Sequence, residues 1–272
     1  MSLDLDTRQR AMLREMGVHV WLAQHQPALV QPGMDPVAVN QTGAAPVLPP
    51  VLAATPVPTS LPATEFFQPM VLTEEHWGAL AHRVAQCQAC TLCAARKHPT
   101  LSVEAPVQSD WFVLGDPPDE DEDRQARPFV EQPGVLLDNM LKAVGARRGG
   151  HGRQGAYVSN VVKCRPPSGR LPLAEEMAQC ANHLHHEIAM VQPRLILAVG
   201  RFATQLLLQD YPEAAGLPLG KLRSVVYRYR GIPVVVSYHP KVLLRASSDK
   251  AKAWADLCLC QDVLEGKVGS LQ

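Results

Sequence analysis

Residues 195–200 read LILAVG, and this short stretch decides the fold class. Five consecutive apolar residues suit a strand that is buried on both faces, and Gly200 closes the run. Helical patterns lie on either side of it, at residues 173–191 and 202–209. A buried strand between two helices is typical of a parallel sheet that carries helices on both faces.

The same alternation extends outward in both directions. Further strands are expected at residues 110–114, 156–162, 225–229 and 233–237, and further helices at 74–94, 135–144 and 250–264. The sequence therefore predicts an α/β domain with three layers and a central, largely parallel sheet over residues 73–266. Ligands of such sheets bind beyond the carboxyl ends of the strands.

Two segments precede this domain. Residues 1–25 place Leu13, Met16 and Trp21 at helix-like spacing, in a helix too short to be stable by itself. Either a peptide that binds a partner or a disordered tail fits this pattern. Residues 26–72 are dominated by Pro, Ala, Val, Thr and Gln, which predicts a flexible linker.

The charge balance gives no overall signal for nucleic acid, because the chain has 26 basic and 26 acidic residues. A local basic face is sufficient for binding DNA, however. Acidic residues cluster at 116–123 and many basic ones lie between 147 and 245, which is compatible with one DNA-facing side. The chain has no apolar run of membrane-spanning length, and its first residues lack the apolar core of a secretory signal, so a cytoplasmic protein, associated with the nucleoid if it binds DNA, is expected.

Four of the seven cysteines have the spacing of metal ligands. Cys87 and Cys90 form a tight pair, whereas fifteen residues separate Cys164 from Cys180. Four such thiolates suit an iron–sulfur cluster, and a zinc ion would accept the same ligands. Cys93 extends the first pair to a run of three, which leaves the ligand assignment open, and plain burial remains an alternative.

Several motifs resemble those of the family 4 uracil-DNA glycosylases, the iron–sulfur type. The most specific is YVSNVVKCRPP at residues 157–167, which is similar to that family's asparagine-to-cysteine signature. RPFV at 127–130 precedes it, and YHP at 238–240 and LLR at 243–245 follow it, in the order of that family's motifs. The resemblance implies a uracil-DNA glycosylase-like fold and removal of uracil from DNA in base excision repair.

The resemblance also implies roles for individual residues. A glycosylase must flip the base, stabilise the departing anion and place a carboxylate near the cationic sugar. The implied catalytic residues are Asp116 and His239, and the implied base-binding residues are Gly115, Phe129, Asn160 and His239. The implied DNA contacts are Lys163, Arg165, Leu243, Leu244 and Arg245, and the implied ligands of a 4Fe-4S cluster are Cys87, Cys90, Cys164 and Cys180.

The chain departs from this family at several glycines. The family usually reads GEAPG where residues 115–119 read GDPPD. Ala126 and Glu131 also stand at usual glycines, and Lys241 stands at a usual small residue. Because glycines allow close backbone approach, these changes favour a narrower and more acidic pocket. Two hypotheses follow: a uracil-DNA glycosylase, or a glycosylase-like protein that has lost catalysis.

A second resemblance bears on the latter hypothesis. Leu13, Met16, Gly17, Val18 and Trp21 form a pattern similar to the N-terminal peptide of the psi subunit of the bacterial replicative clamp loader. That subunit combines a glycosylase-like body with a peptide that binds the clamp-loader collar. The resemblance implies clamp-loader subunits as partners of this N-terminal peptide.

Overall fold

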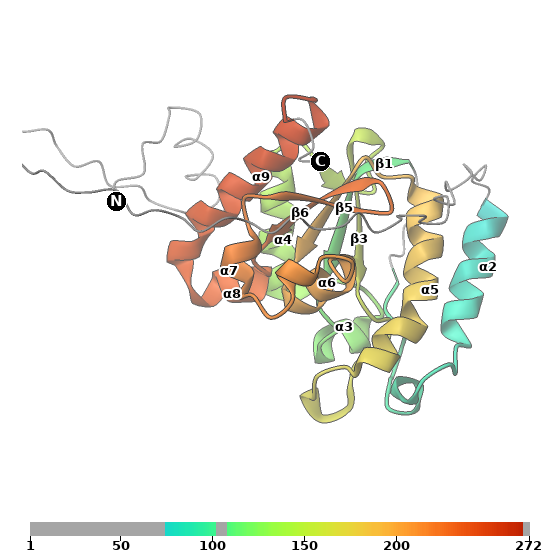
Figure 1. Cartoon of the computed structure of the whole chain (residues 1–272). Coiled ribbons are helices and arrows are strands. Elements are labelled where there is room, and N and C mark those ends of the chain that lie inside the picture. Colours follow the sequence, from blue (N-terminus) through green and yellow to red (C-terminus); the bar gives the residue numbers. More distant parts are fainter. Residues whose placement is uncertain (1–73, 102–107, 269–272) are drawn as a thin grey trace, which may run out of the picture. The chain divides into compact units, whose positions relative to one another are not determined.

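A six-stranded sheet in the order β2-β3-β1-β4-β6-β5 forms the middle of the domain (Figure 1). The computed structural model describes residues 74–101 and 108–268. The strands are β1 (Ser109–Gly115), β2 (Arg147–Arg148), β3 (Gly152–Asn160), β4 (Leu195–Val199), β5 (Val226–Tyr229) and β6 (Ile232–Ser237). Only β5 runs antiparallel, to β6, so the predicted largely parallel sheet is confirmed.

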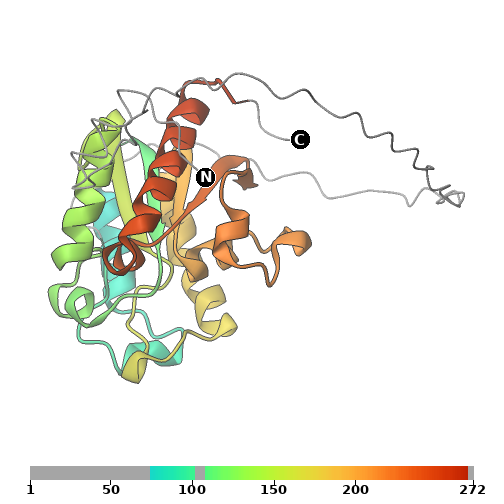
Figure 2. The same cartoon turned by 90° about the vertical axis from the view of Figure 1, so that its left-hand side faces the viewer.

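Helices cover both faces of the sheet. Trp111 and Val113 of β1 point toward α4 (Glu131–Ala143) and α9 (Lys250–Leu264), within one apolar cluster. Phe112 and Leu114 point the other way, toward α5 (Ala174–Val191) and α6 (Arg201–Leu207). Figure 2, which looks onto the side of α4 and α9, shows these two helices in front of the strands. This alternation along one fully buried strand produces the three layers.

The helix α2 (Glu74–Ala85) lies outside the second layer. Leu80 and Val84 pack with Met190 of α5 in a small cluster of their own. The helix predicted for residues 74–94 therefore ends earlier than expected. The chain beyond Ala85 turns into the segment that carries Cys87 and Cys90, and one 3-10 turn, η1 (Thr91–Ala94), follows.

Short elements account for the other differences from the prediction. Periodicity predicts none of the shortest elements, since they are too short for a period to repeat. These are the edge strand β2, the helices α3 (Glu120–Gln125), α7 (Leu219–Leu222) and α8 (Pro240–Arg245), and the turns η2 (Pro167–Gly169), η3 (Pro212–Ala214) and η4 (Ser247–Asp249). The strand predicted for residues 156–162 ends at Asn160. Its neighbour β1 ends at Gly115, opposite Asn160, so the ladder stops there.

The predicted segments 1–25 and 26–72 lie outside the residues that the structure describes. Within the described part of the chain, no helix combines the length and apolar character needed to cross a membrane.

Candidate functional site

Three strands deliver the predicted site residues to one edge of the sheet. β1 and β3 end side by side at Gly115 and Asn160, and β6 ends at Ser237, two residues before His239. Since these strands are parallel, their carboxyl ends meet at the same edge. The structure therefore brings together Asp116, Asn160 and His239, which are far apart in the sequence.

A stacked pair of rings forms the centre of this edge. The rings of Phe129 and His239 lie 5.0 Å apart between centroids, at an angle of 15°. A Cβ added to Gly115 would lie 2.3 Å from the ring of Phe129, so only glycine fits there. Phe129 therefore lies close to two other predicted base-binding residues, Gly115 and His239.

The protonation of His239 is fixed by its surroundings. Burial, and then the nearby charge of Lys241, lowers the pKa of His239 to about 3. Its Nδ1 accepts a hydrogen bond from the backbone N–H of Lys241, at 3.1 Å. The imidazole is therefore neutral near pH 7, and because Nδ1 is an acceptor, Nε2 carries the proton and can donate.

Asn160 presents an unused acceptor beside this stack. Its Nδ2 donates to the carbonyl of Asp116 at 3.0 Å and to Oε1 of Glu122 at 3.2 Å. Its Oδ1 is buried and has no hydrogen-bond partner among the described residues. A buried acceptor without a partner is costly, which points to a donor supplied by a ligand.

The carboxylate of Asp116 lies at the start of α6. Its Oδ1 accepts from the backbone N–H of Phe202 at 2.7 Å, and a Cβ on Gly200 would come within 2.3 Å of its Oδ2. Burial raises the pKa of Asp116, while the backbone N–H groups of Phe202 and Ala203 oppose that shift. The orientation of this carboxylate is therefore fixed by backbone groups.

Glu122 is a buried hub that the sequence analysis did not identify. Its Oε1 accepts from the N–H of Phe129 at 2.6 Å and from Asn160, and its Oε2 accepts from the N–H of Asp119 at 2.9 Å. The sequence carried a signal for it, since Asp119 and Glu122 form a capping box at the start of α3. One carboxylate thus holds both the stacking ring and the amide of the site.

Arg148 of β2 is the second residue that was missed. Its guanidinium donates to the carbonyls of Pro128 at 3.1 Å, Phe129 at 3.0 Å and Gly134 at 3.3 Å. These carbonyls belong to the loop in which Phe129 adopts a φ of +52°. No local sequence pattern predicts this role, because Arg147 and Arg148 read as two ordinary surface arginines and the carbonyls that Arg148 contacts lie 14 to 20 positions away.

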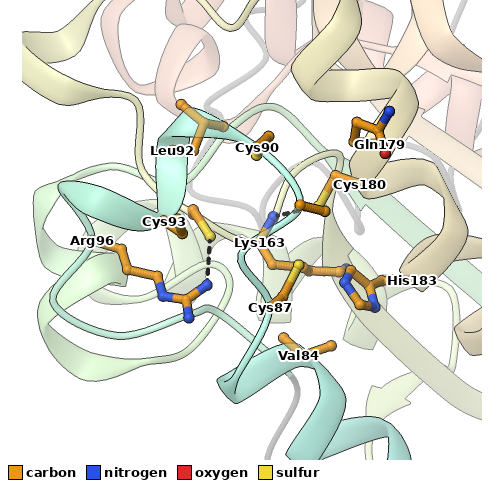
Figure 3. Close-up of a pocket in the computed structure, with 12 residues that line it drawn as sticks. Val84, Cys87, Cys90, Leu92, Cys93, Arg96, Lys163, Gln179, Cys180 and His183 are labelled. Carbon is orange, nitrogen blue, oxygen red and sulfur yellow. Dashed lines mark hydrogen bonds between the residues drawn. The ribbon is translucent and has the colours of Figure 1, made fainter.

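Five cysteines line one pocket near the same edge, shown in Figure 3. Cys87, Cys90 and Cys93 come from the segment after α2, Cys164 follows β3 and Cys180 lies on α5. Two donors already point at sulfur: Nη1 of Arg96 lies 3.2 Å from Sγ of Cys164, and the N–H of Lys163 lies 3.2 Å from Sγ of Cys180. All seven cysteines lie in the described residues, and none forms a disulfide.

Among the described residues, no group of three or more Cys, His, Asp or Glu side chains is arranged as a metal-ion site. A 4Fe-4S cluster takes four cysteine thiolates as its ligands. A pocket lined by cysteines with N–H groups directed at two sulfurs is compatible with such a cluster.

Comparison with known proteins identifies the family. The profile of the Uracil DNA glycosylase superfamily matches residues 102–258. The chain belongs to the uracil DNA glycosylase superfamily. It is 33% identical to a Type-4 uracil-DNA glycosylase of Thermotoga maritima, over 67% of this chain and 91% of that protein. It is 32% identical to a Type-4 uracil-DNA glycosylase of Pyrobaculum aerophilum, over 65% of this chain and 88% of that protein.

A more distant match reaches beyond the repair proteins. The chain is 23% identical to a DNA polymerase of Bacillus phage SP01, over 57% of this chain but only 16% of that protein. A Type-5 uracil-DNA glycosylase of Pyrobaculum aerophilum is 35% identical over 32% of this chain and 37% of its own length.

Two of the DNA contacts predicted for this glycosylase-superfamily chain are wrong. Lys163 is only 2% exposed, and its Nζ lies 2.6 Å from Oε2 of the buried Glu187. It also contacts Ser159 and, at 3.2 Å, the carbonyl of Asn160. Lys163 therefore stabilises the end of β3 from inside the core and is not free to bind phosphate.

Leu243 is the other correction. It is 0% exposed and packs in the apolar cluster of α4 and α9, because it lies on the inner face of α8. Leu244 is 43% exposed and Arg245 is exposed, so both side chains are accessible and their contact with DNA stays a prediction. Arg165 is half-buried and pairs with Glu120 at 3.2 Å.

Proposed function

We propose that this chain is a uracil-DNA glycosylase, which hydrolyses the N-glycosidic bond of a flipped deoxyuridine. The buried, unpartnered Oδ1 of Asn160 is the observation that supports this function most directly. Uracil has an N–H at ring position 3, which can donate to that oxygen, whereas cytosine has a bare nitrogen there. An unpaired buried acceptor discriminates strongly against a base that cannot donate to it.

The remaining residues supply the other parts of the chemistry. Phe129 is 3% exposed and stacks on His239, and its ring is proposed as the apolar platform that a base contacts when it enters the site. The Nε2–H of neutral His239 can donate to the uracil oxygen on which negative charge develops as the bond breaks. The carboxylate of Asp116, whose orientation the N–H of Phe202 fixes, can stabilise the cationic sugar or position the attacking water.

We further propose that Cys87, Cys90, Cys164 and Cys180 hold a 4Fe-4S cluster. Support comes from their shared pocket and from the N–H groups directed at Cys164 and Cys180. When bound, the cluster supplies a covalent link between the segment after α2, the end of β3 and α5. Cys93 lines the same pocket and is the spare thiol in this assignment.

The activity is tested with a single-stranded oligonucleotide that contains one uracil. Base removal leaves an abasic site, which hot alkali converts into a strand break. We expect cleavage of the uracil substrate and none of the matched cytosine substrate. Failure to cleave at enzyme concentrations well above that of the substrate would refute the proposed activity.

The partner of the N-terminal peptide is a separate proposal. Residues 1–25 are proposed to bind clamp-loader subunits, on their sequence pattern alone. A large aromatic side chain is a common anchor for such peptides. If full-length protein and a chain that lacks residues 1–70 captured clamp-loader subunits equally well, the peptide would have no such role. Separately, the exposed side chains of Leu244 and Arg245 are proposed to contact DNA.

A further inference from the structure

Lys241 joins two loops that lie 122 positions apart in the chain. Its Nζ lies 2.6 Å from Oδ2 of Asp119 and 3.3 Å from Oε2 of Glu122. Asp119 and Glu122 belong to the segment after β1, whereas Lys241 belongs to α8, directly after β6 and His239. These are the two segments that carry Asp116 and His239.

This ion pair differs from an ordinary surface pair because one partner is buried. The side chain of Glu122 is only 3% exposed, while those of Lys241 and Asp119 are 33% and 37% exposed. Glu122 also accepts the hydrogen bonds from Phe129 and Asn160. A buried carboxylate needs a compensating charge, and Lys241 is the cation that pairs with it among the residues described by the structure. The position of the base-binding groups therefore depends on Lys241 through Glu122.

Lys241 touches the other half of the site through its backbone. Its N–H donates to Nδ1 of His239, since Pro240 has no N–H to offer. Burial alone would lower the pKa of Lys241, but the carboxylates of Glu122 and Asp119 outweigh it and the pKa is raised. Lys241 is thus a permanent cation. Its side chain pairs with Asp119 and Glu122, and its backbone N–H binds His239.

We propose that Lys241 is a positioning residue for base removal, which clamps the loop after β1 onto the loop after β6 through Asp119 and Glu122. This inference rests on the proposed glycosylase activity. The clamp holds Asn160 and Phe129 at a fixed distance from His239 before the base enters. Preorganised groups of this kind act on the chemical step, and small displacements of them are costly in rate.

A direct contact between Lys241 and a DNA phosphate is the competing role. Loss of a phosphate contact weakens binding and reduces its salt dependence by about one unit of slope. Loss of a clamp lowers kcat and leaves the salt dependence of binding unchanged. The split between kcat and KM therefore separates the two roles.

Three variants isolate the clamp. Lys241→Met removes the cation, and Lys241→Arg restores a cation that can still reach a carboxylate. Asp119→Asn removes one partner charge but keeps the side chain that caps α3, because asparagine is also a good N-cap. Lys267→Met is the matched control, since it deletes an exposed lysine that pairs with Glu265 at 2.5 Å near the end of α9.

We expect Lys241→Met to lower the single-turnover rate at least about tenfold, with an unchanged salt slope, and Lys241→Arg to recover most of that loss. Lys267→Met should cleave at the parent rate. The double variant Lys241→Met with Asp119→Asn should lose no more rate and no more melting temperature than Lys241→Met alone, because the pair is already broken.

The outcomes are distinguishable from those of the proposed function. An inactive parent protein overturns the glycosylase activity and the positioning role with it. An active parent whose Lys241→Met variant changes only KM and the salt slope makes Lys241 a phosphate contact and overturns the clamp. Fully additive losses of melting temperature for the two single variants overturn the Asp119–Lys241 coupling and leave the activity standing.

Discussion

Replacing Arg148 by methionine tests how the stacking ring is held. The change removes the guanidinium but keeps a side chain of similar length. It leaves the carbonyls of Pro128, Phe129 and Gly134 without this donor, and it frees Asp138, whose Oδ1 lies 2.6 Å from Nε of Arg148. All four bonds come from one planar group, as only arginine can provide.

The magnitude follows from these contacts. A hydrogen bond from a charged donor contributes about 1.5–3 kcal/mol when buried, but Arg148 is one-quarter exposed and its pair with Asp138 lies at the surface. We therefore expect a total loss of about 2–4 kcal/mol in the free energy of unfolding. For a domain of this size that corresponds to roughly 5–15 °C in melting temperature.

The substitution should also slow cleavage. Phe129 has a φ of +52° and Glu131 a φ of +53°, and such a loop needs its carbonyls to be held. Once they are released, the ring should leave its position opposite His239 and the single-turnover rate should fall about ten- to a hundredfold. Thermal unfolding and cleavage of a uracil oligonucleotide measure the two effects.

The neighbouring Arg147 provides the control. It is exposed and adjacent in the sequence, so Arg147→Met changes the same net charge without touching the Phe129 loop. Arg148→Lys should recover only part of the loss, because an ammonium cannot reach three carbonyls at once. If Arg148→Met melted and cleaved as Arg147→Met does, the guanidinium would not position Phe129.

Four further predictions concern the rest of the site. Asn160→Asp should lower both stability and activity, because it places a second carboxylate 3.2 Å from Glu122, and a melting temperature equal to the parent's would contradict this. His239, with its pKa lowered to about 3, stays neutral in the folded state, whereas in the unfolded chain it takes up a proton below about pH 6.5. Its contribution to the free energy of unfolding should therefore fall by about 1.4 kcal/mol for each pH unit below that value. Thermal unfolding of His239→Gln should show a shallower dependence on acid pH than that of the parent. Serine at Cys87, Cys90, Cys164 or Cys180 should bleach the absorbance of the proposed cluster at about 400 nm, whereas Cys93→Ser should not. Stoichiometric zinc in anaerobically purified protein would count against the assignment. Glu131→Gly should be neutral or stabilising by up to about 1 kcal/mol, since glycine adopts a left-handed φ without steric cost, and a clear loss of melting temperature would show that the Glu131 side chain matters more.

The sequence was sufficient for five of the six strands and insufficient for the edge strand β2 and the short helices. The runs at β1 and β4 are continuous and apolar, so burial on both faces could be inferred without any contact information. The helices α3 and α8 have six residues each, too few for a period of 3.6 to repeat. Their capping signals, Asp119 with Glu122 and His239 before Pro240, were the only local marks of where they begin.

The same limit explains the errors in the site. Lys163 lies in a motif that follows a strand, where a cation suggests a phosphate contact. Its pairing with Glu187, 24 positions later on α5, has no local signature. Leu243 and Leu244 are adjacent and chemically identical, and only the packing of α8 decides that one is buried and the other exposed. Contacts between distant segments set both outcomes.

Asp119 and Lys241 show why single departures from a family pattern are weak grounds for inferring lost function. Taken alone, Asp119 adds an acid near the edge that is proposed to face DNA, and Lys241 adds bulk beside His239. Each departure by itself argues against catalysis. The structure places their charged groups 2.6 Å apart. Lys241 lowers the pKa of Asp119 against the opposing effect of burial, so the acid is ionised and paired. The acid therefore presents little net charge to DNA, and the two departures together leave Asn160, Phe129 and His239 assembled around the unused acceptor. The acceptor of Asn160 favours the enzyme over the accessory protein, because a buried acceptor without a partner is costly and is not expected to persist in a site that has lost its function.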